Sequence, residues 1–191
     1  MLYSVVKNFC KLLYNIVFRI EIEGEENIPS SGAAIICPNH ISNHDAVLVT
    51  IAIKRKLAFL GKEELFRFKP FGAVLKKLGA IPVNRGTGDI GAVRKAIEVL
   101  KEDKLMIIFP EGTRNKSDDL LLEFKSGASL IAYKAQCPII PCAISGKYRP
   151  FSKLRIVFGE SVDTLGKTKN DVHNLTDEIK TSVRSMLEEV R

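Results

Sequence analysis

The stretch Ala33 to Asp45, "AAIICPNHISNHD", joins a short apolar run to a dense polar cluster. The run "AAIIC" contains no polar side chain except its final cysteine, a pattern typical of a strand buried inside a sheet. The seven residues from Asn39 to Asp45 hold two of the three histidines in the chain, together with two asparagines, a serine and an aspartate. An apolar strand that ends in such a cluster predicts a ligand site at its carboxyl end.

The rest of the chain alternates short β-branched runs with helical patterns. Strands are predicted at 19–24, 33–37, 57–61, 80–83, 105–109, 139–144 and 154–159. Helices are predicted at 1–18, 43–54, 70–78, 89–102, 126–136 and 170–190. This order predicts an α/β fold: a mixed, largely parallel β-sheet covered by helices. A chain of 191 residues is most simply one domain with a substantial core.

Three polar clusters directly follow predicted strands. They are "PNHISNHD" after "AAIIC", "NRGTGD" after "AIPV", and "PEGTRNKSDD" after "LMIIF". The carboxyl ends of parallel strands meet at one edge of a sheet. We therefore expect the three clusters to be neighbours in space.

The composition fits a globular protein, with 46% hydrophobic residues and four cysteines that show no paired metal-ligand spacing. Such thiols are typical of a reduced, intracellular protein. The net charge is +7, and residues 54–77 alone carry eight of the 29 Lys and Arg residues, with four phenylalanines between them. A basic surface with aromatic residues suits nucleic acid, an anionic membrane or a phosphate-rich ligand, and it also occurs as an ordinary solvated helix face.

The first 19 residues predict an amphipathic helix. A polar stripe recurs at steps of three and four, and leucine, valine, isoleucine, phenylalanine and tyrosine fill the remaining positions. Charges interrupt the segment too often for a span of ~20 apolar residues. A wide apolar face with basic residues is typical of a helix that lies in a membrane interface, although a helix packed on the protein's own core has the same pattern. We expect a membrane-association helix at 1–19 and one further domain at 20–191.

The two neighbouring histidines allow two interpretations. His40 and His44 have the i, i+4 spacing of metal ligands on a helix, but Ile41 stands where a zinc protease needs glutamate. The alternative pairs His40 with Asp45. On a continuous helix these two side chains would diverge by roughly 140°, so they converge only across a turn. Ser42-x-x-Asp45 is a helix-start signature that supplies this turn, with Ser42 and Asn43 as expected caps. A carboxylate on one imidazole nitrogen would make His40 a general base.

The motifs resemble those of the 1-acylglycerol-3-phosphate (lysophosphatidate) acyltransferase family. "NHISNHD" resembles the family's first block, "GAIPVNR" the second, "FPEGTR" the third and "CPIIPCAI" the fourth, and "EFKSGA" also fits. The blocks occur in the family's order over about half of the chain. The second block departs from the family pattern, because Asn84 stands where members often have aspartate. The single short N-terminal helix resembles the peripheral members more than the membrane-spanning ones.

The resemblance implies transfer of a fatty acyl group from a thioester to the free hydroxyl of a lysophospholipid. By this resemblance His40 is the base and Asp45 its orienting partner, while Asn39 would hold the loop by backbone hydrogen bonds. The acceptor's phosphate would be bound by the following residues: Arg85, Gly112, Thr113, Arg114 and Lys125. Glu111 would orient an arginine or bind a glycerol hydroxyl. No metal is expected, and no cofactor apart from the thioester co-substrate, which is acyl-CoA or acyl carrier protein.

The expected partners are an anionic membrane surface, the lysophospholipid acceptor and, as one donor, acyl carrier protein; no nucleic acid is expected. The expected location is the cytoplasmic face of the cell membrane, with peripheral or monotopic attachment. Four alternatives stay open from the sequence: another acceptor such as glycerol-3-phosphate or another lysolipid, a metallohydrolase, a non-catalytic membrane-binding module, and a Cys37 acyl-enzyme.

Overall fold

The computed structural model describes residues 2–77, 79–83 and 90–189. The strands are β1 (Arg19–Glu23), β2 (Ala34–Pro38), β3 (Leu57–Lys62), β4 (Ala80–Val83), β5 (Leu105–Ile107), β6 (Ile139–Gly146) and β7 (Lys153–Phe158). The helices are α1 (Leu2–Val17), α2 (Asp45–Ala52), α3 (Lys69–Lys77), α4 (Ile90–Leu100), α5 (Gly127–Ala135) and α6 (Val172–Glu189). Every predicted strand and helix is present, with ends shifted by a few residues.

The described strands form one sheet in the order β1-β7-β6-β2-β5-β3-β4. Five pairings are parallel, and the pairing of β6 with β7 is antiparallel. The predicted mixed, largely parallel α/β fold is therefore confirmed. Strands β2, β3, β4, β5 and β6 run in the same direction, so their carboxyl ends lie along one edge of the sheet.

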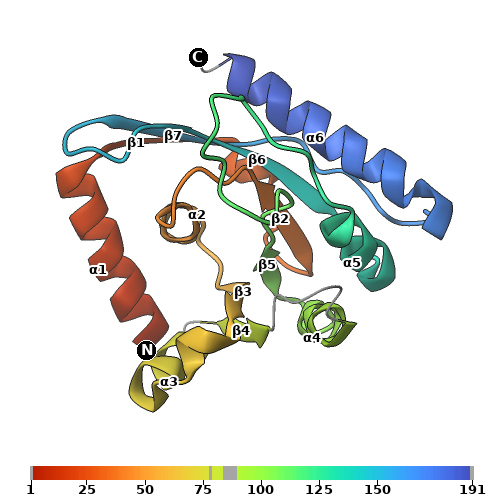
Figure 1. Ribbon diagram of the computed structural model, residues 1–191, viewed down its shortest axis with the longest axis horizontal. Coiled ribbons are helices and arrows are strands. Elements are labelled where there is room, and N and C mark those ends of the chain that lie inside the picture. The colour runs from red at the N-terminus through yellow and green to blue at the C-terminus, as the bar shows by residue number, and fades with distance from the viewer. Residues whose placement is uncertain (1, 78, 84–89, 190–191) are drawn as a thin grey trace.

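Helices cover both faces of the sheet (Figure 1). On one face, side chains of α4, α5 and α6 pack with Ile35, Cys37 and Met106 of the central strands. On the other face, α2 and the inner side of α1 pack with Ala34 and Ile36. Strand β2 is buried along its whole length because it lies in the middle of the sheet and both of its faces are covered.

Helix α1 lies against α2 and the beginning of β3. The Leu57 N–H donates to the Tyr3 hydroxyl (3.2 Å), and the Lys7 ammonium donates to the Ile53 carbonyl. The opposite side of α1 is apolar and exposed; its large exposed side chains are Leu2, Val5, Phe9, Leu12, Leu13 and Ile16. Among the described residues, no helix is both long and apolar enough to cross a membrane.

Two element ends differ from the sequence prediction in ways that affect the site. Strand β5 ends at Ile107 and not at Phe109. Pro110 has no N–H to continue a ladder, and the chain turns as the Gly112 N–H donates to the Phe109 carbonyl (3.0 Å). Helix α2 begins at Asp45 with His44 as its N-cap residue, and no side chain makes the cap hydrogen bond. Neither Ser42 nor Asn43 is the N-cap residue, so that expectation was wrong in position, but the Ser42 hydroxyl accepts the His44 N–H at 3.2 Å and the Ser42 N–H donates to Asp45 Oδ2 at 2.7 Å.

Candidate active site

His40 and Asp45 are in contact across the turn that leads from β2 into α2. His40 Nδ1 lies 2.8 Å from Asp45 Oδ2. The predicted convergence is confirmed, and its cause is local: the chain turns at residues 41–44, so Asp45 in the first turn of α2 points back to the loop. Because a carboxylate oxygen can only accept, the hydrogen-bonding proton of the imidazole is on Nδ1.

Asp45 is fully buried, at 0% exposed, and its carboxylate accepts several hydrogen bonds. The backbone N–H groups of Ile41 and Ser42 each donate to Oδ2 at 2.7 Å. The Tyr148 hydroxyl donates to Oδ1, also at 2.7 Å. A buried carboxylate needs such donors, since it has lost its hydration. Asp45 therefore both closes the His40 turn and presents a fixed acceptor to the imidazole.

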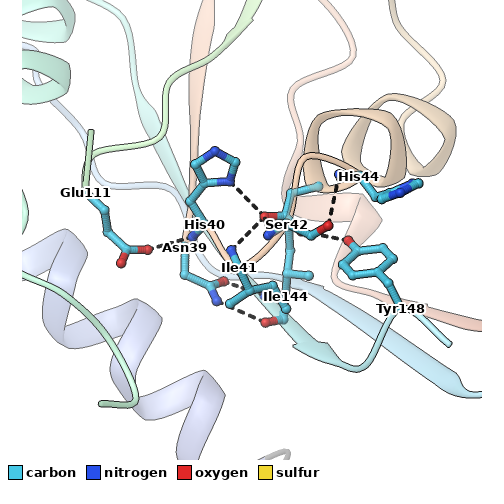
Figure 2. A network of polar contacts seen from close by, with 9 residues as sticks. Asn39, His40, Ile41, Ser42, His44, Glu111, Ile144 and Tyr148 are labelled. Carbon is cyan, nitrogen blue, oxygen red and sulfur yellow. Dashed lines mark hydrogen bonds and ion pairs between the residues drawn. The ribbon is translucent and has the colours of Figure 1, made fainter. Parts of the chain in front are cut away.

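Glu111 supports the backbone of His40. Its Oε1 accepts the His40 N–H at 2.6 Å, and its Oε2 accepts the Leu122 N–H at 3.2 Å. Figure 2 shows Glu111 and Tyr148 on opposite sides of His40. The expected role of Glu111 was to orient an arginine or bind a glycerol hydroxyl. With 2% of its surface exposed and both oxygens bonded to backbone amides, it instead fixes the loop that carries His40.

Asn39 joins the loop to the neighbouring strand β6. Its Oδ1 accepts the Ile144 N–H at 2.7 Å, and its Nδ2 donates to the Ile144 carbonyl at 3.0 Å (Figure 2). The expectation that Asn39 holds the loop through backbone hydrogen bonds is confirmed. This pair of bonds continues the β2–β6 ladder past Pro38, where the backbone of β2 no longer pairs.

The His40 ring stacks on Phe109, with ring centroids 4.0 Å apart and planes at 23°. Only 15% of the His40 side chain is exposed. Phe109 was predicted as the last residue of a strand and not as a site residue. Its position one residue before the Pro110 turn is what brings the ring to His40.

The residues expected to bind phosphate are near His40 where the structure describes them. The Asn115 N–H donates to the His40 carbonyl at 2.7 Å, which brings the segment containing the exposed Thr113 and Arg114 beside the loop. Gly112 has φ +70°, and a Cβ built there would lie 3.0 Å from Lys125 Nζ. The exposed Lys125 side chain therefore passes close over the Gly112 backbone. Arg85, in the segment 84–89, lies outside the described residues.

The two histidines have separate surroundings. His44 Nδ1 lies 2.6 Å from the Tyr14 hydroxyl of α1, and its ring stacks on Tyr148 with centroids 5.2 Å apart. The metal interpretation requires His40 and His44 to lie on one face of a helix. Because α2 begins only at Asp45, the two histidines do not share a helical face. Within the described parts of the chain, no group of three or more His, Cys, Asp or Glu side chains could hold a metal ion.

Cys37 is an unfavourable nucleophile. It is fully buried in β2, and its burial raises the pKa of the thiol well above its ordinary value. It also belongs to the packed cluster on the α5–α6 face, whereas His40 follows two residues beyond the end of the buried strand core. The geometry favours His40, whose Nδ1 contacts Asp45 and whose Nε2 lies on the other side of the ring, as the group that can exchange a proton with a substrate.

Comparison with known proteins identifies the family of the chain. A family model described as Acyltransferase matches residues 19–145. The chain is 28% identical over 165 residues to the 1-acyl-sn-glycerol-3-phosphate acyltransferase of Bacillus subtilis, covering 83% of this chain and 81% of that protein. It is 31% identical over 185 residues to the enzyme of the same name from Borreliella burgdorferi, covering 91% of this chain and 73% of that one.

Among solved structures, the chain resembles the 1-acyl-sn-glycerophosphate acyltransferase PlsC from Thermotoga maritima. The TM-score is 0.81 at 30% sequence identity, and the match covers 98% of this chain and 79% of that chain. The sequence blocks, the sheet with its site at the strand ends and these matches agree. The chain therefore belongs to the acyltransferase family, the family that includes the 1-acyl-sn-glycerol-3-phosphate acyltransferases.

Proposed function

We propose that the protein transfers a fatty acyl group from an acyl thioester to the free sn-2 hydroxyl of 1-acylglycerol-3-phosphate, forming phosphatidate. The observation that carries the proposal is the His40–Asp45 contact of 2.8 Å at the carboxyl end of β2. The names of the relatives, all 1-acyl-sn-glycerol-3-phosphate acyltransferases, support the acceptor.

The reaction follows from the position of the imidazole proton. Asp45 holds the proton of His40 on Nδ1, so Nε2 has a lone pair that takes the proton of the acceptor hydroxyl. The acceptor oxygen attacks the thioester carbonyl carbon, and the resulting tetrahedral adduct collapses by breaking the carbon–sulfur bond. The imidazolium returns its proton to the departing sulfur, and the products are an ester and a free thiol. A positioned base of this kind contributes ~10²–10⁴ in rate.

The donor is acyl-CoA or acyl carrier protein. Because a thioester is already activated, the reaction needs no other cofactor and no covalent acyl-enzyme. The Asp45 carboxylate does not itself take a proton in this scheme; it stabilises the imidazolium that His40 becomes.

The acceptor's phosphate would be bound by cationic and amide groups near the His40 loop. Arg114 is an exposed cation two residues after Gly112, and the exposed Lys125 side chain lies close to the Gly112 backbone. Arg85 is proposed from its sequence motif alone. Guanidinium groups suit this task because they can contact two phosphate oxygens at once.

The membrane partner is proposed from the exposed surface of α1. Its six large apolar side chains are exposed by 43–62%. Contiguous exposed apolar groups mark an interaction surface, and a lysophospholipid acceptor lives in a bilayer. The exposed cations Arg67, Lys69 and Lys76 in and before α3 would favour an anionic leaflet, as at the cytoplasmic face of the cell membrane.

The test is acyl transfer to 1-acylglycerol-3-phosphate in liposomes, with both thioester donors, for wild type, His40→Ala and His44→Ala. We expect kcat to fall by ~10²–10⁴ in His40→Ala. His44→Ala is the comparison variant, since it removes the other imidazole of this turn, which stacks on Tyr148 and contacts Tyr14 but has no hydrogen bond to Asp45 among the described residues; we expect a smaller loss than in His40→Ala. A folded His40→Ala variant with wild-type turnover would exclude His40 as the base. Absence of turnover in folded wild type with both donors would indicate another acceptor, such as glycerol-3-phosphate, or a binding role.

A further inference from the structure

The Asp45 carboxylate is held from two directions. Its Oδ2 accepts from His40 Nδ1 and from the N–H groups of Ile41 and Ser42, all on the loop that carries the base. Its Oδ1 accepts at 2.7 Å from the Tyr148 hydroxyl, which is 103 residues further along the chain and follows β6. The Tyr148 bond therefore ties the carboxylate to a different part of the fold.

The Tyr148 ring is itself fixed by aromatic neighbours. His44 stacks on it, with centroids 5.2 Å apart and planes at 27°, and Phe18 meets it edge-on at 5.9 Å and 87°. The Tyr14 hydroxyl in turn lies 2.6 Å from His44 Nδ1. We call Tyr14, Phe18, His44 and Tyr148 the aromatic cluster. Its members come from α1 and the residue after it, from the N-cap of α2 and from the segment between β6 and β7 (Figure 2 shows His44 and Tyr148).

The Tyr148 hydroxyl is a donor throughout the pH range in which the protein would work. Burial, and then the charge of Asp45, raises the pKa of Tyr148 far above its ordinary value of 10.0. The phenol therefore stays protonated, and the carboxylate always meets the hydrogen of an O–H.

We propose that Tyr148 is a positioning residue for the acyl transfer: its hydroxyl fixes the rotation of the Asp45 carboxylate so that Oδ2 stays in line with His40 Nδ1. The inference rests on the proposed role of His40 as general base. Tyr148 does not itself touch the reacting atoms, and it acts through Asp45.

The physical reason is that, among the described residues, the Tyr148 hydroxyl is the one hydrogen-bond donor to Oδ1 of this buried carboxylate. Asp45 is 0% exposed, so no bulk water is available to bond Oδ1 if the hydroxyl is removed. A buried carboxylate oxygen without a donor is unfavourable, and rotation about the Cβ–Cγ bond toward the loop amides relieves it. That rotation changes the geometry of the His40 contact. A base that works through an oriented imidazole loses rate when its partner carboxylate turns.

The experiment compares Tyr148→Phe with Tyr14→Phe in the liposome assay. Both substitutions remove one phenol hydroxyl from the aromatic cluster and keep the ring, but only Tyr148 bonds Asp45. We expect Tyr148→Phe to lower kcat ~10-fold, a part of what the base supplies, with KM for both substrates unchanged. We expect Tyr14→Phe, which removes a hydroxyl that contacts His44 and not Asp45, to lower kcat less than Tyr148→Phe does. Thermal melts of each variant give the folded fraction to which kcat is referred.

A double-mutant cycle separates positioning from a structural role. In an Asp45→Asn background, Tyr148→Phe should cause no further loss of kcat, because the group it positions is already altered. An equal fold-loss in both backgrounds, or a wild-type kcat in the single Tyr148→Phe variant, would overturn the proposal. The proposed function fails separately: in that case His40→Ala itself keeps the wild-type kcat, whatever Tyr148→Phe does.

Discussion

At the scale of single residues, the site is defined by what each carboxylate accepts. Asp45 accepts hydrogen bonds from the loop amides and the imidazole, while Glu111 accepts hydrogen bonds from the His40 and Leu122 amides. Burial raises the pKa of Glu111, and the two amide hydrogen bonds oppose that shift. Glu111 is thus a buried acid whose ionised form is disfavoured by desolvation and is stabilised by backbone donors.

Glu111→Gln should lower both stability and kcat. A carboxamide has one oxygen acceptor and one NH₂ donor, so either the His40 or the Leu122 N–H would face another donor. We expect a loss of about 1–3 kcal/mol in the free energy of unfolding, the cost of an unsatisfied buried group. We also expect a lower kcat, because the His40 backbone is no longer fixed. Urea unfolding and the liposome assay measure the two effects.

The difference in unfolding free energy between wild type and Glu111→Gln should depend on pH, with a sign that the Glu111 pKa fixes. The pKa of Glu111 in the folded state is raised above the ordinary value of 4.5, so the folded protein binds more protons than the unfolded chain above that pH. Its contribution to stability is therefore complete below pH 4.5 and is lost as the pH rises through the folded pKa. The stability advantage of wild type over Glu111→Gln should shrink as pH rises from 5 to about 8. An advantage that grows with pH would contradict the raised pKa.

At the scale of elements, α1 has two apolar faces, one packed on the protein and one exposed. Tyr3, Cys10 and Tyr14 face the protein, while the apolar stripe of the opposite side is exposed. Docking of the exposed stripe on a membrane surface, as proposed, would account for its apolar side chains in a helix too short to span a bilayer. The alternative from the sequence, a helix that merely packs on the core, accounts for only the inner face.

A double substitution on the exposed stripe tests the membrane role. Leu12 and Ile16 are 60% and 62% exposed, so Leu12→Gln with Ile16→Gln should leave the melting temperature nearly unchanged. Each side chain is worth up to about 1.5–3 kcal/mol on full transfer out of water, so binding to anionic vesicles should weaken by roughly 10-fold or more. Asn8→Gln is the control, since Asn8 is exposed and polar on the same helix. Undiminished vesicle binding in a sedimentation assay would exclude the stripe as the docking face.

At the scale of the whole molecule, helices pack on both faces of the sheet, and the site lies at the edge where the parallel strands end. Three of the four cysteines, Cys37, Cys137 and Cys142, are buried in or beside β2 and β6, and all four are free thiols. Burial raises the pKa of the Cys137 thiol to about 12 and also raises the pKa of the Cys142 thiol well above its ordinary value. Reaction of these thiols thus requires opening of the core.

Thiol labelling should report this packing. In the native protein, a thiol reagent should modify Cys10 quickly, because Cys10 is partly exposed, and the other three only after unfolding. Cys10→Ser should abolish the fast reaction and leave the slow one. Rapid labelling of Cys37 in the native state would contradict the buried core and would make the acyl-enzyme alternative worth testing again.

The order of strands and helices and the convergence of His40 with Asp45 after the second predicted strand were predicted from the sequence, whereas the choice of His40 over His44 as the base rested on the family resemblance and stays a prediction. Period-2 and period-3.6 patterns depend on near neighbours, and the His40–Asp45 contact spans only five positions. The backbone hydrogen bonds of Asn39 and the position of Lys125 just before a helix were likewise expected. The membrane role of residues 1–19, the donor and the role of Arg85 stay predictions.

The tertiary structure alone decided which distant groups complete the site. Glu111 reaches the His40 N–H across 71 positions, and Tyr148 reaches Asp45 across 103. Such contacts depend on which strands are adjacent and on where each strand ends, and no local pattern encodes either. The motif "FPEGTR" pointed to Glu111 but suggested a substrate contact, because the sequence does not show that both of its oxygens face backbone amides. Tyr148 had no local signal, since its partner becomes its neighbour only when β2 and β6 pair and α1 closes over the turn.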